Sequence, residues 1–251
     1  MSRSNLAEPL PIDLDVDRRK SRSVQVYDVM RAAIVTLQLK PGEPISENRV
    51  CRQFEVSRTP VREAIIRLSR EELINVFPHD GSYVAPIKLR KVIEGHFVRD
   101  ALEIAIMKRV ATIWNRKHSR TVRAIINRQT DFIRKRDFVE FHRQDELFHL
   151  AFAACVGMNG VWSVVQEAKT HLDRVRHLAT PVEGHMERII EEHTAIVDAL
   201  DAGKPVEAVA ALQFHLDTVF RTITLLTEKH REFFDDFDEV KNLAEVAFEQ
   251  F

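Results

Sequence analysis

The chain has 251 residues, of which 45% are hydrophobic, 30% charged and 8% aromatic, with only 7 Gly and 9 Pro. This composition excludes wholesale disorder and collagen-like structure, and its many Ala, Leu, Glu and Arg favour helices over a β-sandwich or barrel. No apolar run approaches the roughly 18–20 residues that span a bilayer, and the first residues lack the apolar stretch of a secretory signal. Cys51 and Cys155 lie far apart and form no CxxC motif. We therefore expect a cytoplasmic protein without a membrane partner.

The formal net charge of -1 conceals an uneven distribution along the chain. From Arg18 to Arg90 there are 14 Lys and Arg against 8 Asp and Glu, a net charge of +6. From Lys91 to Phe251 the numbers are 22 against 26, a net charge of -4. A basic first part joined to an acidic second part suggests that the first part binds a polyanion.

In chain order, residues 1–21 are polar and lack periodicity, so we expect a flexible arm. Apolar residues then recur at helical spacing from about Ser23 and predict a helix that must end at the turn residues 39–42. Ser46 is suited to cap a short second helix, and a third helix is predicted to start near Thr59.

The periodicity changes after this third helix. Residues 73–77 and 82–84 predict two short strands on either side of the breaker sequence Pro78-His79-Asp80-Gly81. Three helices followed by a hairpin, all within about 65 residues, predict a winged helix-turn-helix domain over residues 22–86.

From Lys91 onward nearly the whole sequence follows helical spacing, without an internal repeat. We expect an antiparallel bundle of six or seven helices over residues 87–232, followed by an acidic, Phe-rich tail over residues 233–251. The expected helices cover residues 90–113, 118–135, 137–155, 159–178, 184–201 and 205–230. The predicted fold class is thus mainly α, with an N-terminal winged helix-turn-helix domain and a C-terminal helical bundle.

Four polar residues are concentrated where the third helix begins: Ser57, Arg58, Thr59 and Arg62. A helix N-terminus carries free N–H groups and the positive end of the helix dipole, and in a helix-turn-helix this end enters the major groove. Arginine can hold guanine O6 and N7 with two bonds, and hydroxyl groups can bind phosphate. Arg49 is placed for the DNA backbone, and Gly81 at the wing tip allows a close approach. The alternative is that the hydroxyls only cap the helix and the arginines are solvated.

The run VSRTPVREA, with Pro41-Gly42 before it and Gly81-Ser82-Tyr83-Val84 after it, closely resembles the winged-helix domain of GntR-family bacterial transcription regulators. The helical second half is similar to the FCD ligand-binding domain of the FadR-like branch, so the resemblance covers about residues 22–230. It implies a protein of the bacterial cytoplasm. It also implies that six residues contact DNA: Arg49, Ser57, Arg58, Thr59, Arg62 and Gly81. Glu72 departs from the family pattern, which usually has Gly at this junction of helix and wing.

In the second half, polar residues interrupt the apolar faces of three predicted helices. Asp145 and His149 are four residues apart, on or beside a stripe that we expect to be buried and that contains Phe138, Phe141, Phe148 and Phe152. His193 and His215 interrupt apolar stripes on two later helices. Burial of these groups without partners is costly, so they should be paired or bound to a metal. For any one histidine, a hydrogen-bonded place in the core is the alternative.

Imidazole and carboxylate ligands suit a divalent metal ion, with Zn favoured and Ni, Mn or Fe as alternatives. The resemblance supports a metal, because Asp145, His149, His193 and His215 match the Asp-x3-His … His … His pattern of metal-binding FCD domains. His142, His171, His177 and His185 do not fall on that pattern and are interpreted as ordinary polar positions.

Four protein ligands leave one or two coordination positions on an octahedral ion for a small carboxylate, and the family commonly senses organic acids. Arg99 is a second candidate for binding such an effector, since a guanidinium group can hold a carboxylate through two bonds. A structural ion pair between Arg99 and Glu103 is the alternative.

The first hypothesis is a ligand-responsive transcriptional regulator, a repressor that binds a palindromic double-stranded operator as a homodimer. A small organic acid, bound at or near the metal, would release it from DNA. The alternatives are a metal-dependent enzyme with a DNA-binding domain and a sensor of the metal itself. No GxSxG, HExxH or P-loop motif supports the enzyme.

Overall fold

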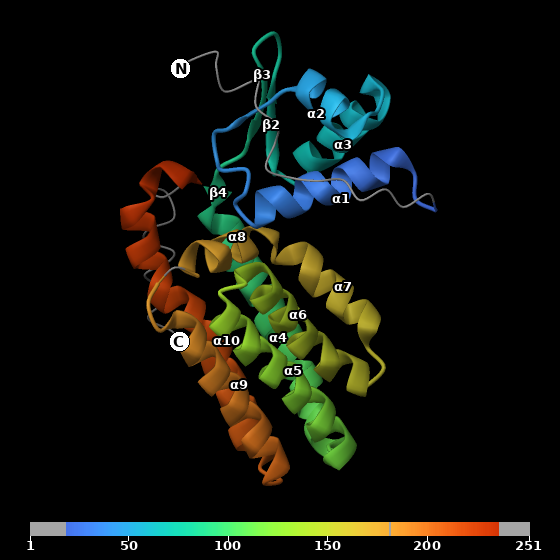
Figure 1. Cartoon of the computed structure of the whole chain (residues 1–251). Helices are drawn as coiled ribbons and strands as arrows, with labels where there is room; N and C mark the ends of the chain where they lie inside the picture. Colours follow the sequence, from blue (N-terminus) through green and yellow to red (C-terminus); the bar gives the residue numbers. More distant parts are fainter. Residues whose placement is uncertain (1–18, 181, 236–251) are drawn as a thin grey trace. The chain divides into compact units, whose positions relative to one another are not determined.

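The computed structural model of the chain describes residues 19–180 and 182–235 (Figure 1). These residues divide into two compact units: residues 19–88 together with His230–Asp235, and Leu89–Lys229. Most of the expected arm and of the expected acidic tail lies outside the described residues. No helix in the described ranges is long and apolar enough to cross a bilayer.

The first unit is a three-helix domain with a small sheet. Its helices are α1 (Arg22–Val35), α2 (Glu47–Phe54) and α3 (Arg58–Arg70). Its strands β1 (Pro44–Ile45), β2 (Ile74–Phe77) and β3 (Gly81–Val84) form an antiparallel sheet in the order β1-β3-β2. Figure 1 shows the β2–β3 hairpin extending away from the three helices as a wing. The winged helix-turn-helix prediction is confirmed.

The caps and the core of this unit follow from its sequence. Ser46 caps α2 as predicted, accepting a hydrogen bond from the Arg49 backbone N–H at 3.3 Å. The apolar stripe of α3 is buried in the core that it shares with α1 and the sheet. Its members are Val61, Ala64, Ile65 and Leu68, and Leu73, just after the helix, is buried with them. Burial of this stripe fixes α3 against the rest of the unit and leaves its polar face exposed.

Two short strand pairings were not predicted. The two-residue strand β1 pairs with β3, and β4 (Ile87–Lys88) pairs in parallel with β5 (Phe234–Asp235), which follows the short 3-10 helix Arg231–Phe233. Segments of two residues show no periodicity, so only their partners reveal them as strands.

The junction between α3 and the wing explains the departure at Glu72. The Glu72 and Leu73 backbone N–H groups bond to the carbonyls of Ser69 and Leu68, at 3.1 and 2.9 Å, which is the Schellman ending of a helix. This ending requires a left-handed residue, and Glu72 has φ 58°. A glutamate therefore adopts the conformation for which glycine is suited, and its side chain pairs with Lys88.

We expect Glu72→Gly to be more stable than Glu72→Ala by about 1 kcal/mol, because both lose the Lys88 pair but only alanine keeps the strained φ. Urea unfolding followed by circular dichroism measures the difference. Equal stability of the two variants would show that this turn is unstrained.

The second unit contains seven described helices: α4 (Leu89–Ile113), α5 (Arg116–Lys135), α6 (Phe138–Cys155), α7 (Asn159–Ala168), α8 (Thr170–Ala179), α9 (His185–Asp201) and α10 (Pro205–Lys229). Figure 1 shows α9 and α10 running side by side, as their short connection requires. The predicted helical bundle is confirmed. One detail is wrong, because Phe138 is 39% exposed whereas Phe141, Phe148 and Phe152 are buried.

The helix predicted over residues 159–178 is broken in two at Lys169. Lys169 is buried, and its ammonium group bonds to Glu146 at 2.6 Å and to Asp173 at 2.6 and 2.7 Å. α4 also lies close to this break at Gly95, where a Cβ atom would come within 2.6 Å of the Ala168 carbonyl oxygen. Contacts with α4 and α6 thus determine the break, and helical periodicity within the segment does not reveal it.

We expect Gly95→Ala to destabilise the helical unit by roughly 1–3 kcal/mol, because its methyl group would meet backbone atoms. Gly160→Ala is the matched control, since Gly160 also lies in a helix but has no heavy atom near its Cβ position. This control should be neutral or stabilising by about 0.5–1 kcal/mol. Tryptophan fluorescence during urea unfolding reports on this unit, because Trp114 and Trp162 both belong to it. Similar effects of the two substitutions would contradict the close packing.

Candidate metal centre and DNA-binding surface

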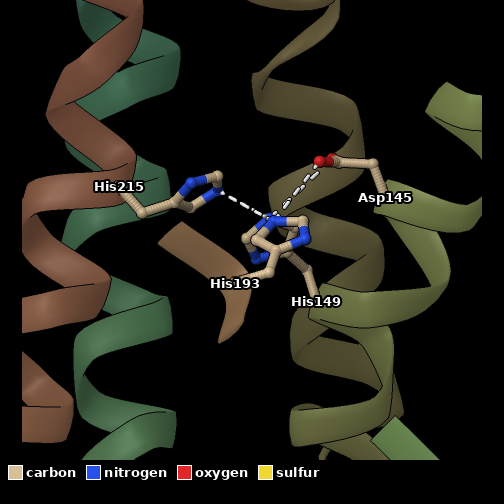
Figure 2. Close-up of side chains that lie close together, drawn as sticks. All are labelled: Asp145, His149, His193 and His215. Carbon is tan, nitrogen blue, oxygen red and sulfur yellow. Dashed lines mark hydrogen bonds and ion pairs between the residues drawn. The ribbon is translucent and has the colours of Figure 1, made fainter. Parts of the chain in front are cut away.

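The four predicted metal-binding side chains come together inside the helical unit. Asp145 and His149 lie on α6, His193 on α9 and His215 on α10. One ligand atom from each lies within 4.8 Å of the others, and all four residues are buried. Figure 2 shows the three imidazole rings and the carboxylate pointing toward one another.

The three imidazoles face one another through their Nε2 atoms. His215 Nε2 lies 3.2 Å from His149 Nε2 and 3.4 Å from His193 Nε2. Two nitrogen ligands of one tetrahedral zinc ion, each at about 2.0–2.1 Å, lie about 3.4 Å apart. The observed spacing of the Nε2 atoms is therefore that of ligands around one ion.

An oxygen acceptor lies within 3.0 Å of the other nitrogen of each imidazole, and for His193 and His215 it forms a hydrogen bond that orients the ring. His149 Nδ1 lies 2.7 Å from Glu103 Oε2, His193 Nδ1 lies 3.0 Å from Gln129 Oε1, and His215 Nδ1 lies 2.9 Å from Glu192 Oε2. An oxygen acceptor beside Nδ1 favours the tautomer with its proton on Nδ1, in which Nε2 keeps a free lone pair. This pattern of outer partners is typical of histidines that bind metal.

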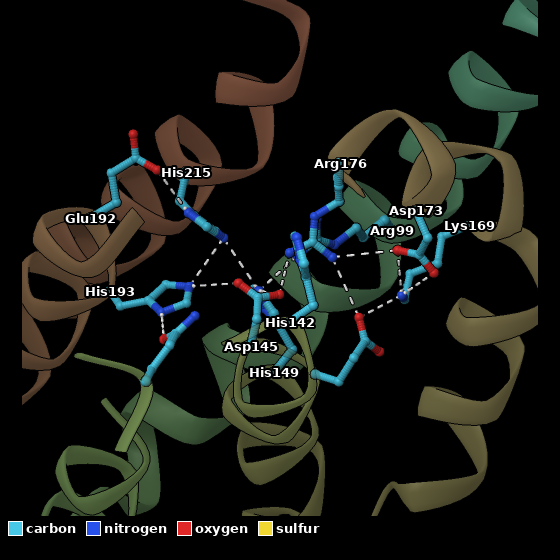
Figure 3. A network of polar contacts seen from close by, with 12 residues as sticks. Arg99, His142, Asp145, His149, Lys169, Asp173, Arg176, Glu192, His193 and His215 are labelled. Carbon is cyan, nitrogen blue, oxygen red and sulfur yellow. Dashed lines mark hydrogen bonds and ion pairs between the residues drawn. The ribbon is translucent and has the colours of Figure 1, made fainter. Parts of the chain in front are cut away.

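Asp145 is held by a network of charged groups (Figure 3). Its Oδ2 accepts a hydrogen bond from Arg176, which also contacts Glu146 and Asp173 at 3.4 Å. Oδ1 is buried, has no hydrogen-bond donor among the described residues, and lies 3.5 Å from His193 Nε2. One carboxylate oxygen is thus fixed, and the other faces the imidazoles.

The electrostatics of Asp145, His193 and His215 favour the protonation states that bind metal. Burial alone would raise the pKa of Asp145, but the neighbouring guanidinium of Arg176 holds that pKa well below its usual value. Burial, with the neighbouring imidazoles, lowers the pKa values of His193 and His215 well below 6.5. A carboxylate and neutral imidazoles are the ligand forms, so the donor set fits a divalent metal ion.

Arg99, the predicted effector-binding residue, is buried beside this cluster. Its Nε donates to Glu103 Oε1 at 2.6 Å, and its Nη2 donates to His149 Nε2 at 2.7 Å. The ion pair named as the alternative is therefore present, and the guanidinium also contacts a candidate ligand. Arg99, Arg176, His215 and Glu192 line a cavity of about 20 Å³, room for about one water molecule.

From the sequence we interpret His142, His171, His177 and His185 as ordinary polar positions, but their surroundings are largely buried. His142, His171 and His185 are buried, and His142 Nε2 lies 2.6 Å from the Thr180 hydroxyl oxygen. Burial holds the pKa of His177 at about 4, and the ring centres of His142 and His177 are 4.1 Å apart. None of the four belongs to the cluster of candidate ligands.

Sequence reasoning missed Arg176 and the orienting residues Gln129 and Glu192. Glu192 directly precedes the candidate ligand His193, and this is the one local feature of the sequence that marks it as part of the site. Gln129 and Arg176 reach the cluster from α5 and α8, and nothing in their own segments marks them.

The predicted DNA-binding residues all belong to the first unit. Arg58, Thr59 and Arg62 are exposed in the first turns of α3, and Ser57 is its N-cap without a side-chain capping bond. Arg49 lies on α2, and Gly81, with φ 142°, starts β3 at the wing. Arg58 donates to Asn48 at 3.1 Å and Arg62 to Glu47 at 3.0 Å, so residues of α2 orient both arginines.

A winged helix-turn-helix unit followed by a helical bundle with a buried polar centre defines a two-domain DNA-binding regulator. Residues 22–84 match the model of bacterial regulatory proteins of the gntR family, and residues 94–218 match the FCD domain. The chain belongs to the GntR family, in the FadR-like branch with an FCD domain.

Three comparisons illustrate this membership. The chain is 33% identical over 209 residues to an HTH-type regulator of an unstable DNA locus of Streptomyces ambofaciens, covering 83% of this chain and 88% of that one. It is 28% identical over 212 residues to the HTH-type transcriptional repressor RspR of Escherichia coli K12, covering 84% and 93%. Among solved structures, Escherichia coli McbR/YncC has a TM-score of 0.69 and 19% identity, covering 84% and 99%. The first two relatives are named as transcriptional regulators, so the enzyme alternative is not supported.

Below pH 6.5 we expect the metal-free protein to lose stability as the pH falls toward 4. Burial lowers the pKa of His177 from 6.5 to about 4, so the unfolded chain binds a proton in this range that the folded protein does not. The loss for His177 alone is roughly 3 kcal/mol, complete near pH 4. Urea unfolding in a chelator, for the wild type and His177→Gln, measures it. The variant should show a shallower pH dependence, and identical slopes would contradict the expectation.

Proposed function

We propose that this protein is a metal-containing, ligand-responsive repressor that binds a palindromic operator as a homodimer. Asp145, His149, His193 and His215 hold a divalent ion, with zinc favoured. A small carboxylate, bound beside the ion, releases the protein from DNA. The observation that carries the proposal is the convergence of three buried Nε2 atoms, each from a ring with an oxygen acceptor within 3.0 Å of its Nδ1.

The placement of the polar residues around α3 supports DNA reading. Arg58 and Arg62 present their guanidinium groups at the end of α3 that enters the major groove in this motif. Ser57 and Thr59 keep exposed hydroxyls for phosphate, Arg49 lies behind them on α2, and Gly81 lets the wing backbone approach the DNA closely. Repression is supported by the similarity to RspR, which is named a transcriptional repressor.

The surroundings of the cluster support a small anionic effector. When bound, the ion supplies a Lewis-acidic position that a carboxylate can occupy. The adjacent cavity is lined by Arg99 and Arg176, two cations suited to the same group. A ligand that binds one arrangement of the helices better than another shifts the protein toward that arrangement, and operator affinity changes with it.

The DNA-binding half can be tested with duplexes selected from a random pool by the full-length protein. We expect Arg58→Ala to lose roughly 1–3 kcal/mol of discrimination at one base pair in each half-site, because one bidentate contact is lost. Affinities for single-base variants of the selected site, measured in titrations, provide the value. Arg123→Ala, on the helical unit, is the control and should bind like the wild type. Unchanged specificity of Arg58→Ala would remove this residue from the interface.

The proposed metal site and its carboxylate effector are tested by metal analysis and by the same DNA-binding titrations. Metal analysis of the purified protein should find one divalent ion per chain, and a carboxylate effector should weaken operator binding only in the loaded protein. A change on chelation alone, without any carboxylate, would instead favour a sensor of the metal.

A further inference from the structure

Arg99 forms a hydrogen bond to His149 Nε2, the nitrogen with which His149 would coordinate a metal ion. Its Nη2 donates to His149 Nε2 at 2.7 Å, on the side where His149 faces His215 and Asp145. An imidazole nitrogen has one lone pair in the ring plane, so it can accept this hydrogen bond or coordinate an ion, but not both. The Arg99 bond and coordination by His149 are therefore mutually exclusive.

Arg176 differs from Arg99 in this respect. It bonds to Asp145 Oδ2, whereas Oδ1 of the same carboxylate has no donor among the described residues and faces His193. Asp145 can thus use Oδ1 for an ion while Arg176 stays in place. Of the two arginines, Arg99 is the one that must move.

The surroundings of Arg99 determine where its guanidinium can go. Nε is paired with Glu103 Oε1 at 2.6 Å, and both side chains are buried, so the stem of Arg99 stays anchored on α4. Arg99 also lines the small cavity between α8, α9 and α10, together with His215 and Thr218. Release of the bond to His149 leaves the N–H groups of Nη2 without that acceptor and available to a ligand beside this cavity.

We propose that Arg99 competes with the metal ion for His149 Nε2, and that displacement of the guanidinium makes room beside the adjacent cavity for a carboxylate that pairs with it. This inference rests on the proposed function and specifies its regulation: ion and carboxylate bind with positive coupling. The coupling has an electrostatic basis, because a dication beside two buried guanidinium groups is repelled, and an anion in the cavity offsets the repulsion. By linkage, each ligand raises the affinity for the other by the same factor.

The test is the affinity of the chelator-treated protein for Zn²⁺, measured by competition with a chromophoric chelator. Arg99→Met keeps the length of the stem but removes all donors, so we expect Zn²⁺ to bind about tenfold tighter than to the wild type. If Arg99 only supports the site from outside, its loss should weaken binding by about 10–100-fold. Equal or weaker binding overturns the proposal.

A second substitution of Arg99 and a control substitution complete this experiment. Arg99→Lys keeps a cation beside Glu103 but is too short to contact both Glu103 and His149, so tighter binding is expected even if Arg99→Met does not fold. Arg123→Met is the matched control, because Arg123 pairs with Asp198 and Asp201 and contacts no candidate ligand. Its Zn²⁺ affinity should equal that of the wild type.

Acetate serves as the probe for the second half of the proposal. It should tighten Zn²⁺ binding to the wild type more than to Arg99→Met, in which only the ion and Arg176 remain to attract it. Equal tightening in the two proteins shows that Arg99 does not bind the carboxylate. A wild type that binds no Zn²⁺ at all contradicts the proposed function itself, whereas one that binds Zn²⁺ no more weakly than Arg99→Met contradicts only this inference.

Discussion

The helical unit depends on one constraint: polar groups buried in its interior need partners, and no single helix supplies them. His149 on α6 takes its partner Glu103 from α4, His193 on α9 takes Gln129 from α5, and His215 on α10 takes Glu192 from α9. An unpaired buried charge or imidazole would cost several kcal/mol, so these helices are held in one register by the same bonds that aim the Nε2 atoms inward.

Much of this arrangement could be predicted from the sequence because it is periodic. The four candidate ligands interrupt apolar faces at helical spacing, and the winged helix-turn-helix follows from three short helices and a hairpin. What could not be predicted depends on contacts between segments. The break at Lys169 follows from bonds to Glu146 and Asp173, and Arg176 reaches Asp145 from another helix. The exposed Phe138 belongs to the predicted stripe but lies at the first residue of α6, where the packing ends.

The arginines of the two candidate functional regions differ in their burial and in how strongly their partners hold them. Arg58 and Arg62 are exposed and held loosely by Asn48 and Glu47, so their bonds can be exchanged for bonds to DNA at little cost. Arg99 and Arg176 are buried among carboxylates, where guanidinium groups move only when another charge replaces theirs. This difference suits a surface that reads a polymer and an interior that responds to a small ligand.

The contact at Gly95 connects the helix that carries Arg99 with the segment before α8. The α4 backbone lies so close to the Ala168 carbonyl that no side-chain atom separates them, so α4 and the start of α8 cannot slide past each other without opening this contact. Arg176 lies on α8, and α4 carries both Arg99 and Leu89, the residue at which the chain leaves the wing-containing unit. The absence of one methyl group at position 95 therefore lets the helix that carries Arg99 pack backbone to backbone against the segment that leads to Arg176.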